Sequence, residues 1–132
     1  MSYLLDTNTC IRYLNGRSDN LRRHLESVPA RDLALCSVVK AELAYGALKS
    51  AQPARNLEVQ GRFTNRFVSL PFDDAAAHTY GEIRAHLERL GTPIGPNDLL
   101  IAAIALTHRA TLVTNNTREF SRVPELQLED WE

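Results

Sequence analysis

Short apolar runs alternate with longer segments of helical periodicity along the whole chain. Five runs have the length and composition of strands, at residues 2–5, 32–36, 67–72, 110–116 and 126–131. Helical patterns follow them, at residues 8–14, 19–28, 38–51, 54–67, 74–90, 97–109 and 117–123. Strands and helices in this order are typical of a mostly parallel sheet with helices on both faces. The sequence therefore predicts a doubly wound α/β fold.

The segment at residues 97–109, "NDLLIAAIALTHR", is apolar on nearly every side. Such a helix needs neighbours on more than one face, so we expect it near the centre of the molecule. The chain has 132 residues, of which 44% are hydrophobic, enough for one well-buried core and too few for two ordinary domains. We expect a single domain over residues 1–132.

For the helix predicted at residues 38–51, the sequence also predicts a capping residue and the side that faces the core. Ser37 is expected to cap its amino end. The spacing of Val38, Leu43, Ala44 and Leu48 predicts that these residues face the core.

The formal charge of −1 excludes a strongly basic field over the whole protein, so nucleic acid could bind only to a local patch. Of the 15 basic residues, 13 are Arg, whose planar guanidinium suits phosphate and carboxylate groups. That bias favours a nucleic-acid or acidic partner, although a preference for Arg codons would explain it equally well.

The two cysteines, Cys10 and Cys36, form neither a CxxC motif nor a secreted disulfide framework. This usage is typical of a reducing cytoplasm, and we expect no disulfide. The longest apolar run, at residues 99–106, is far shorter than the roughly 20 residues that cross a bilayer. We expect a soluble, cytoplasmic protein that does not contact membranes.

Acidic and amide side chains occur where the predicted strands and helices meet. Asp6 closes the first strand, Asn116 and Glu119 follow the fourth, Glu42 lies early in the helix after the second, and Asp98 opens the apolar helix. In a parallel α/β sheet these positions share the rim at the carboxyl ends of the strands. The sequence therefore predicts that these side chains converge.

A cluster of carboxylates raises its own pKa values unless a cation neutralises it. Hard oxygen ligands suit Mg²⁺ or Mn²⁺, and we expect such an ion at this rim. Each acid also has an ordinary explanation: Asp6 could cap a helix, Asp98 could complement a helix dipole, and Glu42 could be solvated.

Four segments together resemble the VapC-type toxins of the PIN-domain ribonuclease family: "LLDTN", "ELAYGALKS", "IGPNDLLIAAIAL" and "TLVTNNTREFSRV". The resemblance runs the full length of the chain. It implies a PIN-like three-layer α/β/α sandwich. It also implies an Mg²⁺-dependent endoribonuclease that cuts structured RNA, often transfer RNA, and so inhibits translation as the toxin of a type II toxin-antitoxin system. The implied partners are a VapB-type antitoxin and a second copy of the chain.

The resemblance also assigns roles to individual residues. The family's catalytic, metal-binding acids fall on Asp6, Glu42 and Asp98. Its small polar supporting positions fall on Thr7, Asn8 and Thr114.

One position departs from the family pattern. Many PIN domains have an aspartate where this chain has Asn116. An amide oxygen can still face a metal or its water but adds no negative charge. Glu119, three residues further on, is the alternative fourth acid, and one tightly held ion is the expectation.

Substrate binding must come from outside the acidic rim. The candidate phosphate-binding residues are Arg12, Lys49, Arg55, Arg62, Arg66 and Arg118. An ordinary solvated face would explain the same arginines equally well.

Two other functions remain open from the sequence. A non-catalytic PIN-fold module could bind RNA or protein, and the departure at Asn116 favours that alternative. An aspartate-based phosphotransfer enzyme would also place an acid at Asp6, but it requires a second acid at the position of Asn8.

Overall fold

The computed structural model describes residues 2–132, whose centre is a five-stranded parallel sheet in the order β3-β2-β1-β4-β5. The strands are β1 (Tyr3–Leu5), β2 (Leu33–Cys36), β3 (Val68–Leu70), β4 (Thr111–Val113) and β5 (Leu128–Glu129). Tyr3 of β1 lies opposite Leu33 on one side and Thr111 on the other. Every neighbouring pair is parallel, which confirms the predicted doubly wound sheet.

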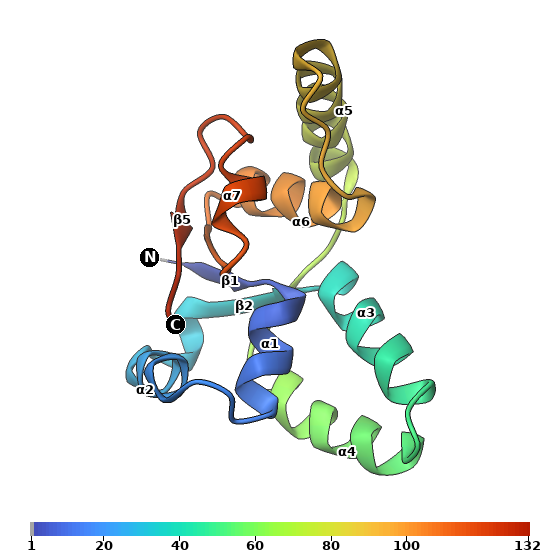
Figure 1. Ribbon diagram of the computed structural model, residues 1–132, viewed down its shortest axis with the longest axis vertical. Coiled ribbons are helices and arrows are strands. Elements are labelled where there is room, and N and C mark those ends of the chain that lie inside the picture. The colour runs from blue at the N-terminus through green and yellow to red at the C-terminus, as the bar shows by residue number, and fades with distance from the viewer. Residues whose placement is uncertain (1) are drawn as a thin grey trace.

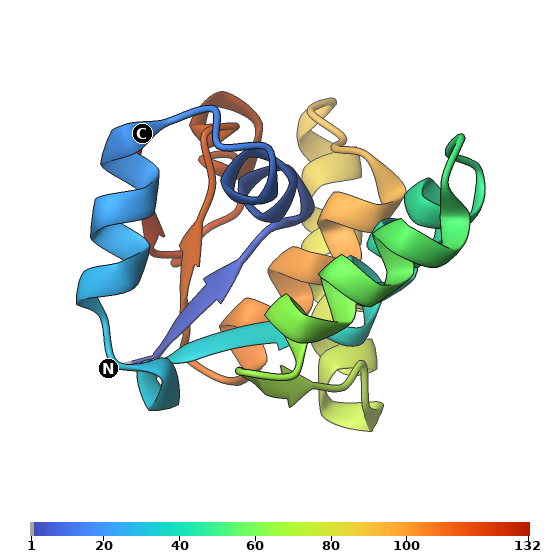
Figure 2. The same ribbon diagram turned by 90° about the horizontal axis from the view of Figure 1, so that it is seen from below.

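Helices cover both faces of this sheet, as Figure 2 shows with α2 on one side and α5 and α6 on the other. They are α1 (Thr7–Leu14), α2 (Asp19–Ser27), α3 (Ser37–Leu48), α4 (Pro53–Thr64), α5 (Asp74–Leu90), α6 (Pro96–Thr107) and α7 (Thr117–Phe120). A short 3₁₀ helix, Ala30–Asp32, precedes β2. Helix α5 packs against α6 and extends beyond the sheet (Figure 1). The architecture is the expected three-layer α/β/α sandwich.

Helix α6 lies in the core, as its composition predicts. Five consecutive residues, 101–105, are essentially inaccessible to solvent. All four residues of β2 are buried as well, which is typical of a strand covered on both faces. Cys10 and Cys36 are buried and unpaired.

Two details of α3 differ from the sequence-based expectation. Cys36 occupies the N-cap position, so Ser37 is the first helical residue. Val39 is buried, whereas Leu48 is 60% exposed. The prediction of Leu48 as a core residue is therefore wrong, because the buried face of α3 is formed by Val39, Leu43 and Ala47, at intervals of four residues, and Leu48 lies off that face.

No helix within residues 2–132 combines the length and the hydropathy needed to cross a membrane.

Candidate active site

Asp6 stands at the junction of β1 and α1. Its amide N–H donates to the carbonyl of Val113 in β4 (3.1 Å), which fixes the backbone at the carboxyl ends of two neighbouring strands. Its Oδ1 accepts the amide N–H of Thr9 (2.8 Å), so the side chain caps α1. Only 4% of Asp6 is exposed. A helix cap does not need such burial, so capping alone does not explain this residue.

The environment of Asp6 has opposing effects on its ionisation. Burial raises the pKa of Asp6, and hydrogen bonding from Thr114 and Thr9 lowers it again. The net direction is upward. Thr114 is fully buried, which suits the small polar supporting role that the sequence suggests for it.

Glu42 connects three helices. Its Oε1 accepts the hydroxyl of Thr7 in α1 (2.5 Å), and its Oε2 accepts the side-chain amide of Asn97 in α6 (3.2 Å). A merely solvated glutamate would not be held by two such donors. Glu42 therefore lies where α1, α3 and α6 meet.

Asp98 lies in the first turn of α6 and is half-buried. Burial, together with the negative charges of Glu119, Asp6 and Glu42 in that order, raises the pKa of Asp98 to about 6. This shift is direct electrostatic support for the predicted convergence, since all three other acids act on one carboxylate.

Glu119, in α7, is the fourth acid near Asp98. Its Oε1 accepts the amide N–H of Gly95 (2.8 Å), and its Oε2 accepts the side-chain amide of Asn116 (3.2 Å). A Cβ on Gly95 would lie 3.8 Å from both the Oδ2 of Asp98 and the Oε1 of Glu119, so both carboxylates border this glycine. Asn116 thus supports Glu119, and its own amide N–H donates to Thr114 Oγ1 (2.9 Å).

The chemistry of this donor set fits a hard divalent cation. Four carboxylates supply oxygen ligands, and the negative charges of their neighbours help to raise the pKa values of Asp6 and Asp98, an effect that a bound cation would reverse. Across residues 2–132, no three His, Cys, Asp or Glu side chains lie at the mutual distances of a formed metal site. Glu42 and Glu119 are instead directed to amide and hydroxyl donors.

Sequence reasoning missed two residues of this site, Asn97 and Gly95. Asn97 stands directly before Asp98, and its side chain holds Glu42. Gly95 presents its amide N–H to Glu119. The segment "GPND" contains both, but nothing in its spacing indicates which distant acids its polar groups would meet.

The candidate phosphate-binding residues are spread over the surface. Arg62 forms an exposed ion pair with Glu58 (3.7 Å), as on an ordinary solvated face. Lys49 and Arg66 lie over the rings of Tyr45 and Phe67, 5.0 and 5.1 Å from the ring centroids.

The other three candidates have different surroundings. Arg12 pairs with Glu132, and Arg118 is exposed in α7. Arg55 lines a groove of about 630 Å³ between α1, α3 and α4.

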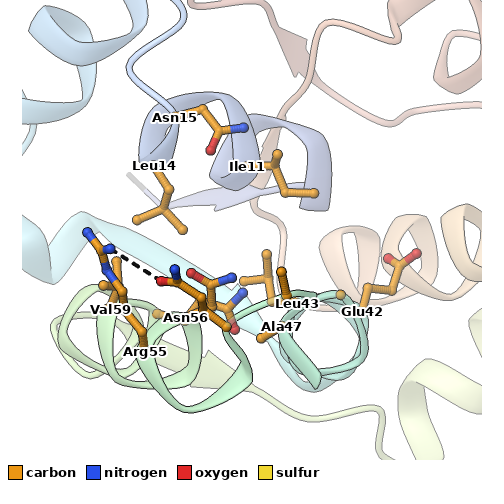
Figure 3. Close-up of a pocket in the computed structure, with 13 residues that line it drawn as sticks. Ile11, Leu14, Asn15, Glu42, Leu43, Ala47, Arg55, Asn56 and Val59 are labelled. Atoms are coloured by element: carbon orange, nitrogen blue, oxygen red, sulfur yellow. Dashed lines mark hydrogen bonds between the residues drawn. The ribbon is translucent and has the colours of Figure 1, made fainter. Parts of the chain in front are cut away.

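Glu42 lies at one end of this groove (Figure 3). Its walls are mixed: Ile11 and Leu14 face Leu43 and Ala47 across it, and polar side chains, Arg55 among them, line the rest. The groove therefore offers both apolar and polar contacts and ends at an acid of the candidate site.

Known proteins are similar to this chain in both sequence and architecture. The profile of the PIN domain family matches residues 3–126. The tRNA(fMet)-specific endonuclease VapC of Salmonella typhimurium is 42% identical over 131 residues, covering 99% of this chain and 98% of that protein. The ribonuclease VapC2 of Rickettsia felis is 42% identical over 133 residues, covering 100% and 99%.

Two solved structures match over nearly their full length. The DNA-bound VapBC of Salmonella typhimurium contains a chain that superposes with a TM-score of 0.94 at 42% identity, covering 100% of this chain and 99% of that one. The VapBC2 of Rickettsia felis, bound to a promoter fragment, gives 0.94 at 41% identity and 100% of both chains. Fold and sequence therefore agree on the same relatives.

Proposed function

The chain belongs to the PIN-domain family and is a VapC-type toxin with endoribonuclease activity, and we propose that Asp6, Glu42 and Asp98 are its catalytic acids. The observation that carries this proposal is the pKa of Asp98, raised to about 6 by burial and by the three surrounding carboxylates. Such mutual repulsion costs free energy unless the site binds a positive charge during its function. The family membership disfavours the aspartate-based phosphotransfer alternative.

PIN-domain ribonucleases depend on a metal, and we propose Mg²⁺, with Mn²⁺ as a substitute, held by Asp6, Glu42 and Asp98. When bound, such an ion lowers the pKa of a water molecule and offsets charge on the phosphate during hydrolysis. Glu119 supplies the fourth negative charge that Asn116 cannot.

The remaining contribution of the chain is orientation. Thr9 and Thr114 hold Asp6, while Thr7 and Asn97 hold Glu42. Asn8 follows on the exposed side of α1, where it can meet substrate. Groups fixed in this way need little reorganisation when the phosphate arrives.

The substrate we propose is structured RNA, and transfer RNA in particular. Its support is the full-length similarity to the Salmonella typhimurium relative named as a tRNA(fMet)-specific endonuclease. Recognition of folded RNA relies on shape and exposed loops, so no short sequence motif would be expected to encode it.

The partner we propose is a VapB-type antitoxin, in keeping with the VapBC complexes among the structural matches. A segment of that antitoxin would lie in the groove between α1, α3 and α4 and direct a basic side chain toward Glu42 (Figure 3). We also propose a homodimer, for which Tyr45 and Leu48 on α3 are exposed by 64% and 60%. The activity would reside in the cytoplasm, where Cys10 and Cys36 stay reduced.

The experiment that tests the catalytic proposal is cleavage of total transfer RNA by purified protein freed of any antitoxin, in Mg²⁺. We expect discrete fragments, and none with EDTA or with Asp6→Asn. Asparagine caps helices about as well as aspartate, so the variant should retain the fold and lose only the charge. Cleavage by Asp6→Asn at the rate of the unsubstituted protein would contradict the assignment. A folded protein that binds RNA without cutting it would favour the binding module.

A further inference from the structure

A polar hollow of about 320 Å³ lies beside α1. It is lined by Asn8, Ile11, Arg12, Asn15, Arg17 and Asn115. The lining includes two guanidinium groups, three side-chain amides and no carboxylate. A site so rich in donors suits an anion with several acceptor oxygens.

The local fold brings these side chains together. Asn8, Arg12 and Asn15 recur at helical spacing and share one side of α1. Gly16 then adopts a left-handed conformation (φ +65°), and the amide N–H of Arg17 donates to the carbonyl of Arg12 (3.0 Å). This turn returns Arg17 to the side of α1 that already carries Arg12.

The hollow is continuous with the candidate active site. Asn8 and Ile11 also line a neighbouring hollow of about 480 Å³, whose other walls include Thr7, Glu42 and Asn97. Asn115 directly follows the buried Thr114, which hydrogen-bonds Asp6. A polymer whose phosphate lies at the acids would therefore pass Arg12 and Arg17 next.

The two arginines differ in whether their guanidinium groups already have an acidic partner. Arg12 Nε forms an ion pair with the side chain of Glu132. The Oε2 of Glu132 is buried and has no partner among the described residues, so this carboxylate is only half satisfied by the contact. The Arg17 side chain is exposed, and within residues 2–132 it makes no ion pair or hydrogen bond.

We propose that this hollow binds a backbone phosphate of the RNA next to the phosphate being cut, with Arg17 as its principal cation. Glu132 competes with that phosphate for Arg12. The inference rests on the proposed ribonuclease function and adds a substrate-positioning site to it. Arg17 acts on binding rather than on the chemical step, since it follows the carboxyl end of α1, whereas Glu42 contacts Thr7 at the amino end.

The test measures binding separately from cleavage. Fluorescence anisotropy of labelled transfer RNA, in EDTA and over a series of salt concentrations, compares the unsubstituted protein with Arg17→Gln and with Arg89→Gln. Arg89 is an exposed arginine in the last turn of α5, so this variant matches the change in net charge. We expect Arg17→Gln to weaken binding about fivefold and to flatten the dependence of log K on log salt by about 0.7 to 0.9, and Arg89→Gln to do neither.

Two further readouts separate the possible outcomes. Glu132→Gln should tighten binding by releasing Arg12, and Arg17→Gln should raise KM for cleavage while leaving kcat unchanged. Equal binding and equal salt dependence for Arg17→Gln and Arg89→Gln would overturn the inference. It would also be overturned if Arg17→Gln weakened binding to an acidic antitoxin segment and left binding to transfer RNA unchanged. Failure of the unsubstituted protein to cut RNA in Mg²⁺ would instead overturn the proposed function, because the anisotropy result does not depend on cleavage.

Discussion

Asp98 is the residue whose ionisation the fold opposes most clearly. Its pKa is raised from 3.8 to about 6 by burial and by Glu119, Asp6 and Glu42. A carboxyl whose pKa is higher in the folded state favours folding below pH 3.8 and opposes it increasingly as the pH rises toward 6. Above pH 6, in the absence of a cation, ionised Asp98 therefore destabilises the protein.

Replacing Asp98 by asparagine should remove this penalty. We expect Asp98→Asn to raise the free energy of unfolding at pH 7.5 in EDTA by about 1 kcal/mol, a value reduced for the half-exposed side chain. The gain should disappear as the pH falls below 4. Urea unfolding at a series of pH values measures it.

The matched control for this prediction is Asp74→Asn. Asp74 lies in the first turn of α5, as Asp98 does in α6, so both variants lose the same kind of helix-dipole interaction. Asp74 is exposed and should not be stabilised by the change. A pH-independent difference between Asp98→Asn and the unsubstituted protein would mean that the acids do not interact as described.

The sequence could predict which acids converge but not how they are held. Asp6, Glu42 and Asp98 follow from the rule that strand ends share a rim, and the coupling among them supports that prediction. The contacts of Asn97 with Glu42 and of Gly95 with Glu119 could not be predicted. The first contact joins residues 55 positions apart in the sequence and the second joins residues 24 positions apart. No local sequence pattern encodes which way such distant side chains point.

At the level of elements, α3 shows where periodicity fails. Its first turns contact the sheet, so Val39 and Leu43 are buried as an amphipathic helix requires. Ala47 in its last turn is buried as well, whereas Leu48, the next residue around the helix, is exposed. The apolar residues of α3 fit more than one face of the helix, and periodicity alone does not select the face that meets the core.

This difference gives a direct stability test. Leu43→Ala should lower the free energy of unfolding by about 2 to 5 kcal/mol, because it leaves a cavity beneath α3. At concentrations low enough to keep the protein monomeric, Leu48→Ala should change it by no more than about 0.5 kcal/mol, because the Leu48 side chain is solvated in the single chain. Denaturant unfolding of the two variants in parallel gives both values. A loss for Leu48→Ala as large as that for Leu43→Ala would contradict the exposure of the Leu48 side chain.

Other elements were predictable because their signals are local. Asp73 caps α5 through the amide N–H of Ala76 (2.9 Å), and Gly91 ends that helix in the left-handed conformation (φ 69°). Both capping signals can be recognised within one helical turn of the sequence. The parallel order of the sheet follows similarly from the alternation of strands and helices. The order β3-β2-β1-β4-β5, by contrast, depends on which crossover passes which face, and the alternation alone does not fix it.

At the level of the whole molecule, the fold concentrates negative charge where β1, α3, α6 and α7 meet, in a chain of nearly zero net charge. The four acids at that place, Asp6, Glu42, Asp98 and Glu119, come from segments far apart in the sequence, so they repel one another only after folding. Folding therefore creates both the repulsion among the acids and a site at which a cation would relieve it. Substrate contacts must lie to the side of this centre, where arginines are available.

A cation that binds the folded acids and not the unfolded chain must stabilise the protein by mass action. At a free Mg²⁺ concentration about 100 times the Kd, the gain would be about 2.7 kcal/mol, or a rise in Tm on the order of 5 to 10 °C. Asp98→Asn should lose most of this rise, and Asp74→Asn should keep it. Differential scanning calorimetry in Mg²⁺ and in NaCl of equal ionic strength separates binding from simple screening of the acids. An equal rise in both salts, or in both variants, would mean that Asp98 holds no metal, because screening acts on every exposed charge whereas ligation requires this carboxylate.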